Sequence, residues 1–262
     1  MAALAVVTGA SSGIGRAYAE RLASDGMDLV LIARRADRLE ELKAELVGRG
    51  VGARSVVADL GRVEDLQRLG AELSTLPVEL LVNNAGLAHY MPFAQLPAER
   101  ARELIDVNTL APILLSRAVV PGMAQRGRGA IINVASLLAF SGAARAPQLP
   151  QRAVYAATKA FLVTFTEILA AELAATGVRV QVVCPGVVRT EFHSRQGIDM
   201  SHVPRMEPDQ IVLASLSDLA HDVVVSIPAL PDESAKARFD DAASVLLAVA
   251  RRTELAPRYG AT

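Results

Sequence analysis

Tyr155 and Lys159 are two residues whose types and spacing are suited to chemistry. They lie in the stretch RAVYAATKAFLVTFTEILAAEL, whose apolar residues recur at helical spacing. Residues four apart share one face of a helix, so an ammonium would stand close to a phenol. The ammonium favours the phenolate and lowers the pKa of the tyrosine from about 10, which suits proton transfer to an alcohol or carbonyl oxygen. Such pairs also occur on helices without chemistry, so the pair needs support from the rest of the chain.

A glycine-rich turn, TGASSGIG, occupies residues 8–15. It follows an apolar strand pattern and opens a helical pattern, which is the context of a dinucleotide-binding turn. The glycines permit a tight turn and a close approach of the backbone to a pyrophosphate, and the helix start offers free N–H groups. The residues of this turn that we expect to contact a cofactor are Gly9, Ser11, Ser12, Gly13 and Ile14.

The end of the second strand pattern indicates which dinucleotide is bound. It reads IARR, with Arg34 and Arg35 where an NAD-binding chain would carry a carboxylate for the ribose hydroxyl. Guanidinium groups suit a 2′-phosphate, and Arg16 after the glycine turn would add positive charge. The two arginines could instead form a solvated loop with Asp37 and Glu40 as partners. The pattern favours NADP over NAD.

Two further strand patterns end in polar or small residues. Asp59, which precedes Leu60, could accept a hydrogen bond from an adenine amino group or could cap the following helix. The next strand pattern runs into Asn84, Ala85 and Gly86, which could let the backbone approach the adenosine or could form an ordinary turn.

Strand and helix patterns alternate along almost the whole chain. This alternation predicts right-handed βαβ units in an α/β fold of the Rossmann type, a doubly wound, seven-stranded parallel sheet with helices on both faces. No linker separates domains, so we expect one nucleotide-binding domain over residues 1–262, with a variable substrate segment at about 187–210. The expected strands are 4–8, 28–33, 54–58, 79–83, 129–135, 178–184 and 222–227, and the expected helices are 13–25, 37–48, 62–75, 98–126, 153–176, 207–220 and 234–252.

Composition excludes several classes of partner. The chain has 27 basic and 28 acidic residues, so nothing in its net charge of −1 suggests a nucleic acid or an anionic membrane. Its single cysteine, Cys184, cannot form an internal disulfide. The four histidines show no metal-binding spacing, so we expect no metal site. No leader or membrane-span pattern is evident, and we expect a soluble, cytoplasmic protein.

Five motifs in order give this chain a resemblance to the short-chain dehydrogenase/reductase family. TGASSGIG, Asp59-Leu60, NNAG, YAATK and the Pro-Gly of 185–186 have the order and rough spacing of that family, over residues 4 to about 190. The resemblance implies a compact, single-domain enzyme in which a nicotinamide cofactor exchanges a hydride with a carbonyl or alcohol. It further implies an acid–base tyrosine with its supporting groups, which are here Tyr155, Lys159, Ser136 and Asn108.

The same resemblance implies cofactor contacts and partners. Tyr155 and Lys159 would contact the cofactor, as would the loop residues Pro185, Gly186, Val188 and Thr190. We expect NADP(H)-dependent interconversion of a ketone or aldehyde and an alcohol, and a homodimer or homotetramer. The alternatives are an NAD(H)-dependent alcohol dehydrogenase and a nucleotide-binding redox sensor without turnover. A nucleotide-sugar dehydratase or epimerase would need more C-terminal chain.

The interval from Ser136 to Tyr155 is longer than is usual in the family. We expect the extra residues to loop outward at the mouth of the site, and Ser141 is the alternative to Ser136. The substrate pocket should be walled by residues 87–95, 137–153 and the segment after Pro185, in which 193–206 has the composition of a mobile lid. Candidate lining residues are His89, Tyr90, Phe93, Phe192, His193 and Met206.

Overall fold

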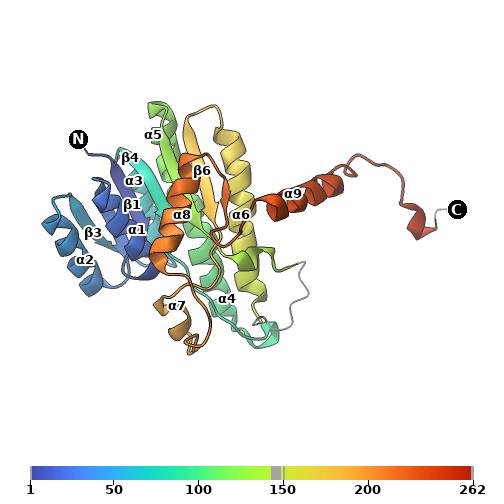
Figure 1. Ribbon diagram of the computed structural model, residues 1–262, viewed down its shortest axis with the longest axis horizontal. Helices are drawn as coiled ribbons and strands as arrows, with labels where there is room; N and C mark the ends of the chain where they lie inside the picture. The colour runs from blue at the N-terminus through green and yellow to red at the C-terminus, as the bar shows by residue number, and fades with distance from the viewer. Residues whose placement is uncertain (1, 143–148, 150, 261–262) are drawn as a thin grey trace. The chain divides into compact units, whose positions relative to one another are not determined.

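The computed structural model of the protein describes residues 2–142, 149 and 151–260. By internal contacts the chain separates into two units, Met1–Pro228 and Ala229–Thr262. In the described part of the first unit, parallel strands form a seven-stranded sheet in the order β3-β2-β1-β4-β5-β6-β7 (Figure 1). The strands are β1 Leu4–Thr8, β2 Asp28–Ala33, β3 Ala53–Val57, β4 Val78–Asn83, β5 Gly129–Val134, β6 Val178–Val183 and β7 Val225–Ser226.

The central strands are short apolar runs because both faces of the sheet are covered. β1 pairs in parallel with β2 from Leu4–Asp28 to Thr8–Ile32, and on its other side with β4. Val6 and Val7 on β1 point to opposite faces, and neither is exposed to solvent. Burial on both faces explains why these strands lack the alternation of a half-exposed sheet.

Two sets of helices cover the two faces of the sheet. One face packs against α1, α2 and α8, and α1 and α8 lie side by side in front of the sheet in Figure 1. The other face packs against α3, α5 and α6. The helices that cover the sheet are α1 Gly13–Ser24, α2 Ala36–Gly48, α3 Val63–Ser74, α5 Ala111–Arg126, α6 Ala153–Leu173 and α8 Pro208–Ala220.

The strand order reverses between β1 and β4. β1 leads on to β2 and β3 on one side, whereas β4 leads to β5, β6 and β7 on the other. The loops at the carboxyl ends of β1 and β4 therefore leave in opposite directions and open a crevice between them. Ligands of doubly wound sheets bind at such a switch point, and the glycine-rich turn follows β1 there.

A buried chain of polar side chains fixes α6 against the centre of the sheet. Asn83 on β4 donates through Nδ2 to Asn133 Oδ1 on β5 at 2.9 Å, and Asn133 Nδ2 donates to Thr166 Oγ1 on α6 at 2.9 Å. Asn133 and Thr166 have no exposed surface, so an unmade bond here would leave a buried polar group without a partner. The network holds the register of the helix that carries Tyr155 and Lys159.

Most elements agree with the predicted ranges to within a few residues. The strand predicted at 222–227 spans only Val225–Ser226, and the helix predicted at 234–252 ends at Leu247. The predicted helix 98–126 is α4 Ala98–Ile105, a π-helical turn at Asp106–Leu110 and α5. A short helix, α7 Glu191–Ser194, overlaps the start of the 193–206 segment that was expected to be a lid. The second unit, described by itself, contains α9 Ser234–Leu247 and a short 3-10 turn at Pro257–Tyr259.

Two helical stretches are long and apolar enough to cross a membrane by length and composition. They are Ala98–Arg126 and Ala153–Leu173, and no such span was expected from the sequence. Both pack against the parallel sheet through apolar side chains of α5 and α6. Helices that cover the core of a globular protein pass the same test, so these two are weak evidence for a membrane span.

Candidate active site

The glycine-rich turn is locked to the end of β4 by hydrogen bonds. Thr8 Oγ1 accepts the backbone N–H groups of Asn84 and Ala85, each at 3.0 Å. Asn84 Nδ2 in turn donates to Thr8 O at 2.9 Å. The side chain of Asn84 therefore stabilises the turn itself, while the backbone at Ala85 and Gly86 continues along the crevice.

Glycine is required where three segments approach one another. Gly9 and Gly13 have φ values of 66° and 56°, which L side chains rarely adopt. A Cβ on Gly13 would lie 2.9 Å from Thr190 Cγ2, and one on Gly86 would lie 3.3 Å from Asn108 Oδ1 and 3.4 Å from Lys159 Nζ. The crevice is thus lined by bare backbone, which fits a dinucleotide that must come close to the main chain.

Asp59 and Leu60 lie at the neighbouring strand end. Asp59 Oδ1 accepts the backbone N–H of Gly61 at 3.0 Å, and the Asp59 N–H donates to Asp65 Oδ2 at 2.9 Å. Asp59 does not cap the following helix, because α3 has Arg62 as its N-cap. Leu60 is buried among apolar residues of the sheet face that α3 covers. Asp59 therefore shapes the turn after β3, and a contact to adenine stays a prediction.

Tyr155 is buried near the start of α6, with 5% of its surface exposed. Burial raises the pKa of its hydroxyl well above 10, and Tyr90 adds to the rise, while the hydrogen bond with Ser136 acts in the opposite direction. The expected lowering of this pKa is therefore absent in the protein alone. The reason is that desolvation of the phenolate outweighs the stabilisation that neighbouring groups provide.

Lys159 lies one turn after Tyr155 and faces the same way. Its Nζ lies 5.8 Å from the centroid of the Tyr155 ring and donates to Val134 O at 2.9 Å. Burial lowers the pKa of Lys159 from 10.5 to about 8. A lysine with this pKa can hold or release a proton near neutral pH, so the helix supplies both a charge and a proton reservoir beside the phenol.

Asn108 lies in the π-helical turn between α4 and α5. Its Nδ2 donates to Leu87 O at 2.9 Å and to Thr158 Oγ1 at 3.1 Å, and its Oδ1 accepts Leu87 N at 3.0 Å. The side chain thus joins the loop after β4 to α6, through bonds to Leu87 and Thr158. π-turns within helices occur frequently at functional sites, and this one places Asn108 beside Gly86 and Lys159.

Ser136 and Ser141 have different surroundings. Ser136 follows β5, caps a 3-10 turn at Leu137–Phe140 by accepting Leu138 N at 3.2 Å, and hydrogen-bonds the Tyr155 hydroxyl. Ser141 donates to Leu138 O at 2.7 Å and accepts from Arg152 Nε at 3.3 Å. The structure therefore brings Ser136 to Tyr155. The expected outward loop falls largely on residues 143–148 and 150, which lie outside the described residues.

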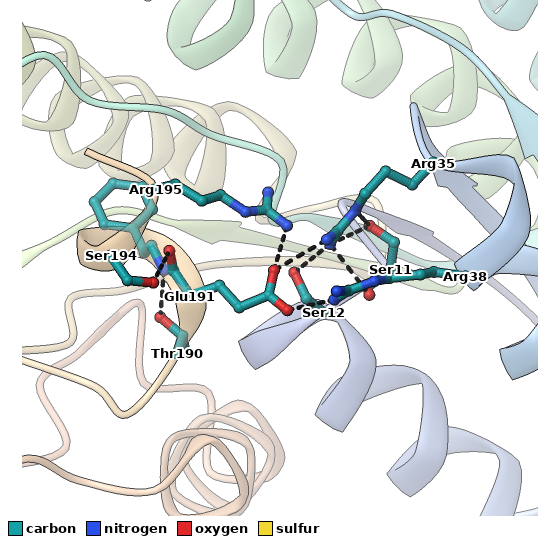
Figure 2. A network of polar contacts seen from close by, with 9 residues as sticks. Ser11, Ser12, Arg35, Arg38, Thr190, Glu191, Ser194 and Arg195 are labelled. Carbon is teal, nitrogen blue, oxygen red and sulfur yellow. Dashed lines mark hydrogen bonds and ion pairs between the residues drawn. The ribbon is translucent and has the colours of Figure 1, made fainter. Parts of the chain in front are cut away.

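The two predicted arginines point in different directions. Arg35 Nη2 donates to Ser11 Oγ at 3.0 Å and Ser12 Oγ at 2.8 Å, so it folds back onto the glycine turn (Figure 2). Arg34 is largely exposed and lies 4.0 Å from Glu103. The structure brings Arg35 to the predicted cofactor turn but does not bring Arg34 there. Arg16 is held by Glu20 and Glu45 instead of facing an open site, although it borders the cavity beside the turn.

A loop after β6 closes the crevice from the other side. Pro185 O accepts Leu137 N at 2.9 Å, and Gly186 lies against Leu137. Val188 forms a parallel bridge with Met206, so the chain between them leaves and returns at one point. Thr190 Oγ1 accepts the N–H of Phe192 and so caps α7. These predicted cofactor residues therefore lie opposite the glycine turn.

Aromatic side chains form an apolar wall over Tyr155. The Tyr90 ring meets the Tyr155 ring edge-on, with centroids 5.5 Å apart, and stacks on His193 at 6.2 Å. Phe192 lies 6.1 Å from the Tyr155 ring. Burial raises the pKa of Tyr90 to about 12 and lowers that of His193. Of the predicted lining residues, Phe93 is instead mostly exposed.

Sequence reasoning missed the ion pairs that join α7 to the glycine turn. Glu191 contacts Arg35, Arg38 and Arg195, and no motif marks this carboxylate. Arg38 lies between Asp37 and Glu40, the two residues that the sequence suggested as partners of Arg34 and Arg35. The available signal was the spacing of Arg35 and Arg38, which are three apart at a helix start. Residues three apart lie on one helix face, so this spacing indicates a shared site for an anion or a carboxylate.

Comparison with known proteins gives concordant matches. A family model described as short chain dehydrogenase matches residues 3–200. An uncharacterized oxidoreductase from Myxococcus xanthus is 36% identical over 239 residues, which span 88% of this chain and 91% of that protein.

Two solved structures resemble the whole chain. A short-chain dehydrogenase from Sphingobium yanoikuyae in complex with NADPH has a TM-score of 0.92 at 38% identity, covering 98% of this chain and 100% of that one. The bulky-bulky ketone specific alcohol dehydrogenase from Comamonas testosteroni has a TM-score of 0.87 at 33% identity, covering 98% of each chain.

Proposed function

Because the chain belongs to the short-chain dehydrogenase/reductase family, we propose that it is an NADP(H)-dependent oxidoreductase that interconverts a ketone or aldehyde and an alcohol. The observation that carries the proposal is the meeting of four side chains at the carboxyl edge of the sheet. Tyr155 hydrogen-bonds Ser136, Lys159 lies under the Tyr155 ring, and Asn108 borders Gly86 beside Lys159.

The residues of the crevice fit a phosphorylated dinucleotide. Gly9, Gly13 and Gly86 leave bare backbone, and Ser11 and Ser12 present hydroxyl groups at the start of α1. When bound, NADP(H) supplies or accepts the hydride. Support for NADP(H) comes from Arg35 and from the NADPH complex of the Sphingobium relative. In that arrangement Arg35 and Arg38 would hold the 2′-phosphate.

Proton transfer is the task of the chain's own residues. In the reductive direction Tyr155 donates its hydroxyl proton to the oxygen of the substrate, and Ser136 donates a hydrogen bond to the same oxygen. The raised pKa of Tyr155 keeps the phenol protonated and ready to donate. The Lys159 ammonium then stabilises the phenolate by charge, and a solvent proton restores the phenol. In the oxidative direction the same groups act in reverse.

The aromatic wall supports a substrate with apolar substituents. Tyr90, Phe192 and His193 enclose the space above Tyr155, and Leu138 packs in the same cluster. Such a wall binds hydrocarbon better than hydroxyl groups or charges. The resemblance to an alcohol dehydrogenase specific for bulky-bulky ketones supports the same class, and we propose ketones with apolar groups as substrates.

The test is a turnover screen with purified protein. Ketones and aldehydes of graded size are offered with NADPH or NADH, and absorbance of the reduced nicotinamide is followed. We expect NADPH to be preferred. Tyr155→Phe should lower turnover by about a thousandfold, the scale of general acid catalysis, with NADPH binding retained. Full turnover by Tyr155→Phe would remove the assigned acid, and equal or better use of NADH would contradict the cofactor assignment.

We also propose that the enzyme is a homo-oligomer. α6 carries exposed apolar side chains, with Phe161 37% and Ile168 57% exposed, and Phe161 stacks on Phe165. Apolar residues in such a patch favour association with a second copy. Light scattering coupled to size exclusion measures the mass, and a monomer at micromolar concentration would contradict this proposal.

A further inference from the structure

Glu191 lies between three guanidinium groups at the mouth of the cofactor crevice. It is the first residue of α7, and its Oε2 accepts from Arg35 Nη1 at 3.0 Å. It also pairs closely with Arg38 and with Arg195 (Figure 2). Arg195 belongs to the same segment as Glu191, whereas the two other arginines lie at the start of α2. The carboxylate therefore ties the substrate loop to the cofactor side of the site.

One of these guanidinium groups, that of Arg35, also contacts the glycine turn. Arg35 holds Ser11 and Ser12 while it contacts Glu191, so all four residues meet at one place. This place borders a cavity of about 590 Å³. The lining includes Ser11, Ser12, Gly13, Arg38, Thr190 and Glu191. Hydroxyl and guanidinium donors at a helix start form an anion site, and Glu191 occupies its cationic edge.

The negative charge of Glu191 is present at every pH at which the enzyme would work. Arg38, followed by Arg35 and Arg195, lowers the pKa of this carboxyl to about 2 despite partial burial. A permanent carboxylate neutralises part of the positive charge that Arg35 and Arg38 would offer to another anion. The side chain of Glu191 is 39% exposed, so solvent screens the interaction but does not remove it.

We propose that Glu191 is a specificity-determining residue that competes with the 2′-phosphate of NADP(H) for Arg35 and Arg38. The inference rests on the proposed use of NADP(H). A phosphate monoester carries nearly two charges and three acceptor oxygens, so it pairs with two guanidiniums better than a carboxylate does. NADH lacks this phosphate and leaves Glu191 in place. The carboxylate thus weakens the binding of NADPH and leaves that of NADH nearly unchanged. It therefore lowers the ratio of the affinity for NADPH to that for NADH.

The test measures binding without substrate. Glu191→Gln keeps the size of the side chain and one acceptor oxygen and removes its charge. NADPH and NADH are titrated separately against wild type and variant, with nicotinamide fluorescence as the signal. Removing one screened charge near the phosphate should tighten NADPH binding about tenfold, with NADH changing by less than about twofold. The gain should shrink as salt is raised, because added ions screen the charges.

A matched control separates this effect from a general change in charge. Glu79 pairs with Arg128 near the amino ends of β4 and β5, and neither residue lines the cavity beside Arg38 and Glu191. Glu79→Gln should therefore leave the ratio of the two affinities unchanged. Glu191→Asp retains the charge on a shorter side chain, and its affinity for NADPH should lie between those of wild type and Glu191→Gln. It provides a second measurement if the glutamine variant is poorly folded.

Each outcome bears on a distinct claim. If wild type binds NADPH and Glu191→Gln leaves the NADPH affinity unchanged or weaker, the competition is refuted while the proposed function stands. An equal gain for NADH also refutes it, because the anion that competes with Glu191 would then be the pyrophosphate, which both cofactors carry. If wild type binds neither cofactor, the proposed function fails and the inference fails with it.

Discussion

Replacing Lys159 by methionine should stabilise the protein while it removes activity. Lys159 is 4% exposed, and its burial lowers its pKa from 10.5 to about 8. This interval corresponds to about 3 kcal/mol of penalty on the charged form at neutral pH. Methionine matches the apolar stem and loses only the hydrogen bond to Val134 O, which contributes about 1 kcal/mol. The net gain in the free energy of unfolding is about 2 kcal/mol at pH 7.

The dependence on pH identifies the cause. Below about pH 8 the folded and unfolded chains both carry the ammonium, so the penalty on wild type is fully present. Between about 8 and 10.5 the folded chain releases the proton first, and the stability of wild type rises relative to the variant. The advantage of Lys159→Met should therefore disappear by about pH 10.

Urea denaturation at a series of pH values between 7 and 10 measures this difference, with turnover measured in parallel. Lys43→Met is the matched control, since Lys43 lies on the surface of α2 and pairs with Glu40. Its stability relative to wild type should not follow the same curve. A loss of stability in Lys159→Met at pH 7, or a gain that does not change with pH, would refute the conclusion that burial destabilises the Lys159 ammonium.

Two further substitutions test neighbouring parts of the site. Tyr90→Phe removes a hydroxyl that raises the pKa of Tyr155. Because alcohol oxidation needs the phenolate, the acidic limb of its pH–rate profile should move to lower pH. A profile that does not move would contradict this expectation. Thr166→Val leaves Asn133 Nδ2 without its buried partner and should cost about 2 kcal/mol in the free energy of unfolding. Urea denaturation measures that cost, and a neutral result would show that the bond between Asn133 and Thr166 does not stabilise the packing of α6.

Local patterns in the sequence were sufficient to predict the strands of the sheet and the order along the chain of the motifs that form the site. The strands are apolar runs bounded by turn residues, and their alternation with helices leaves little choice of topology, so β1 and β2 begin and end at the predicted residues. The Tyr155–Lys159 pair follows from helical spacing alone. The strands and the Tyr155–Lys159 pair depend only on residues that are close together along the chain, so they can be read from one sequence.

Features that depend on three-dimensional proximity were not predictable. The direction of the Tyr155 pKa shift depends on how deeply its ring is buried beneath Tyr90, a residue 65 positions away in the sequence. The different orientations of Arg34 and Arg35 depend on where the backbone turns at the end of β2. Glu191 carries no motif, and it meets Arg35 only because the loop after β6 crosses the glycine turn.

The bridge between Val188 and Met206 brings the two ends of the intervening loop together, so the loop can be replaced as a unit. The chain enters and leaves at adjacent backbone positions, joined by Arg189 N to Met206 O at 2.9 Å and Met206 N to Val187 O at 3.1 Å. The entropy of closing a loop rises by only about 0.6 kcal/mol for each doubling of its length. Loops of other lengths and compositions can therefore be grafted between these two anchors without disturbing the sheet, and such grafts would replace the Phe192 and His193 side chains of the aromatic wall over Tyr155.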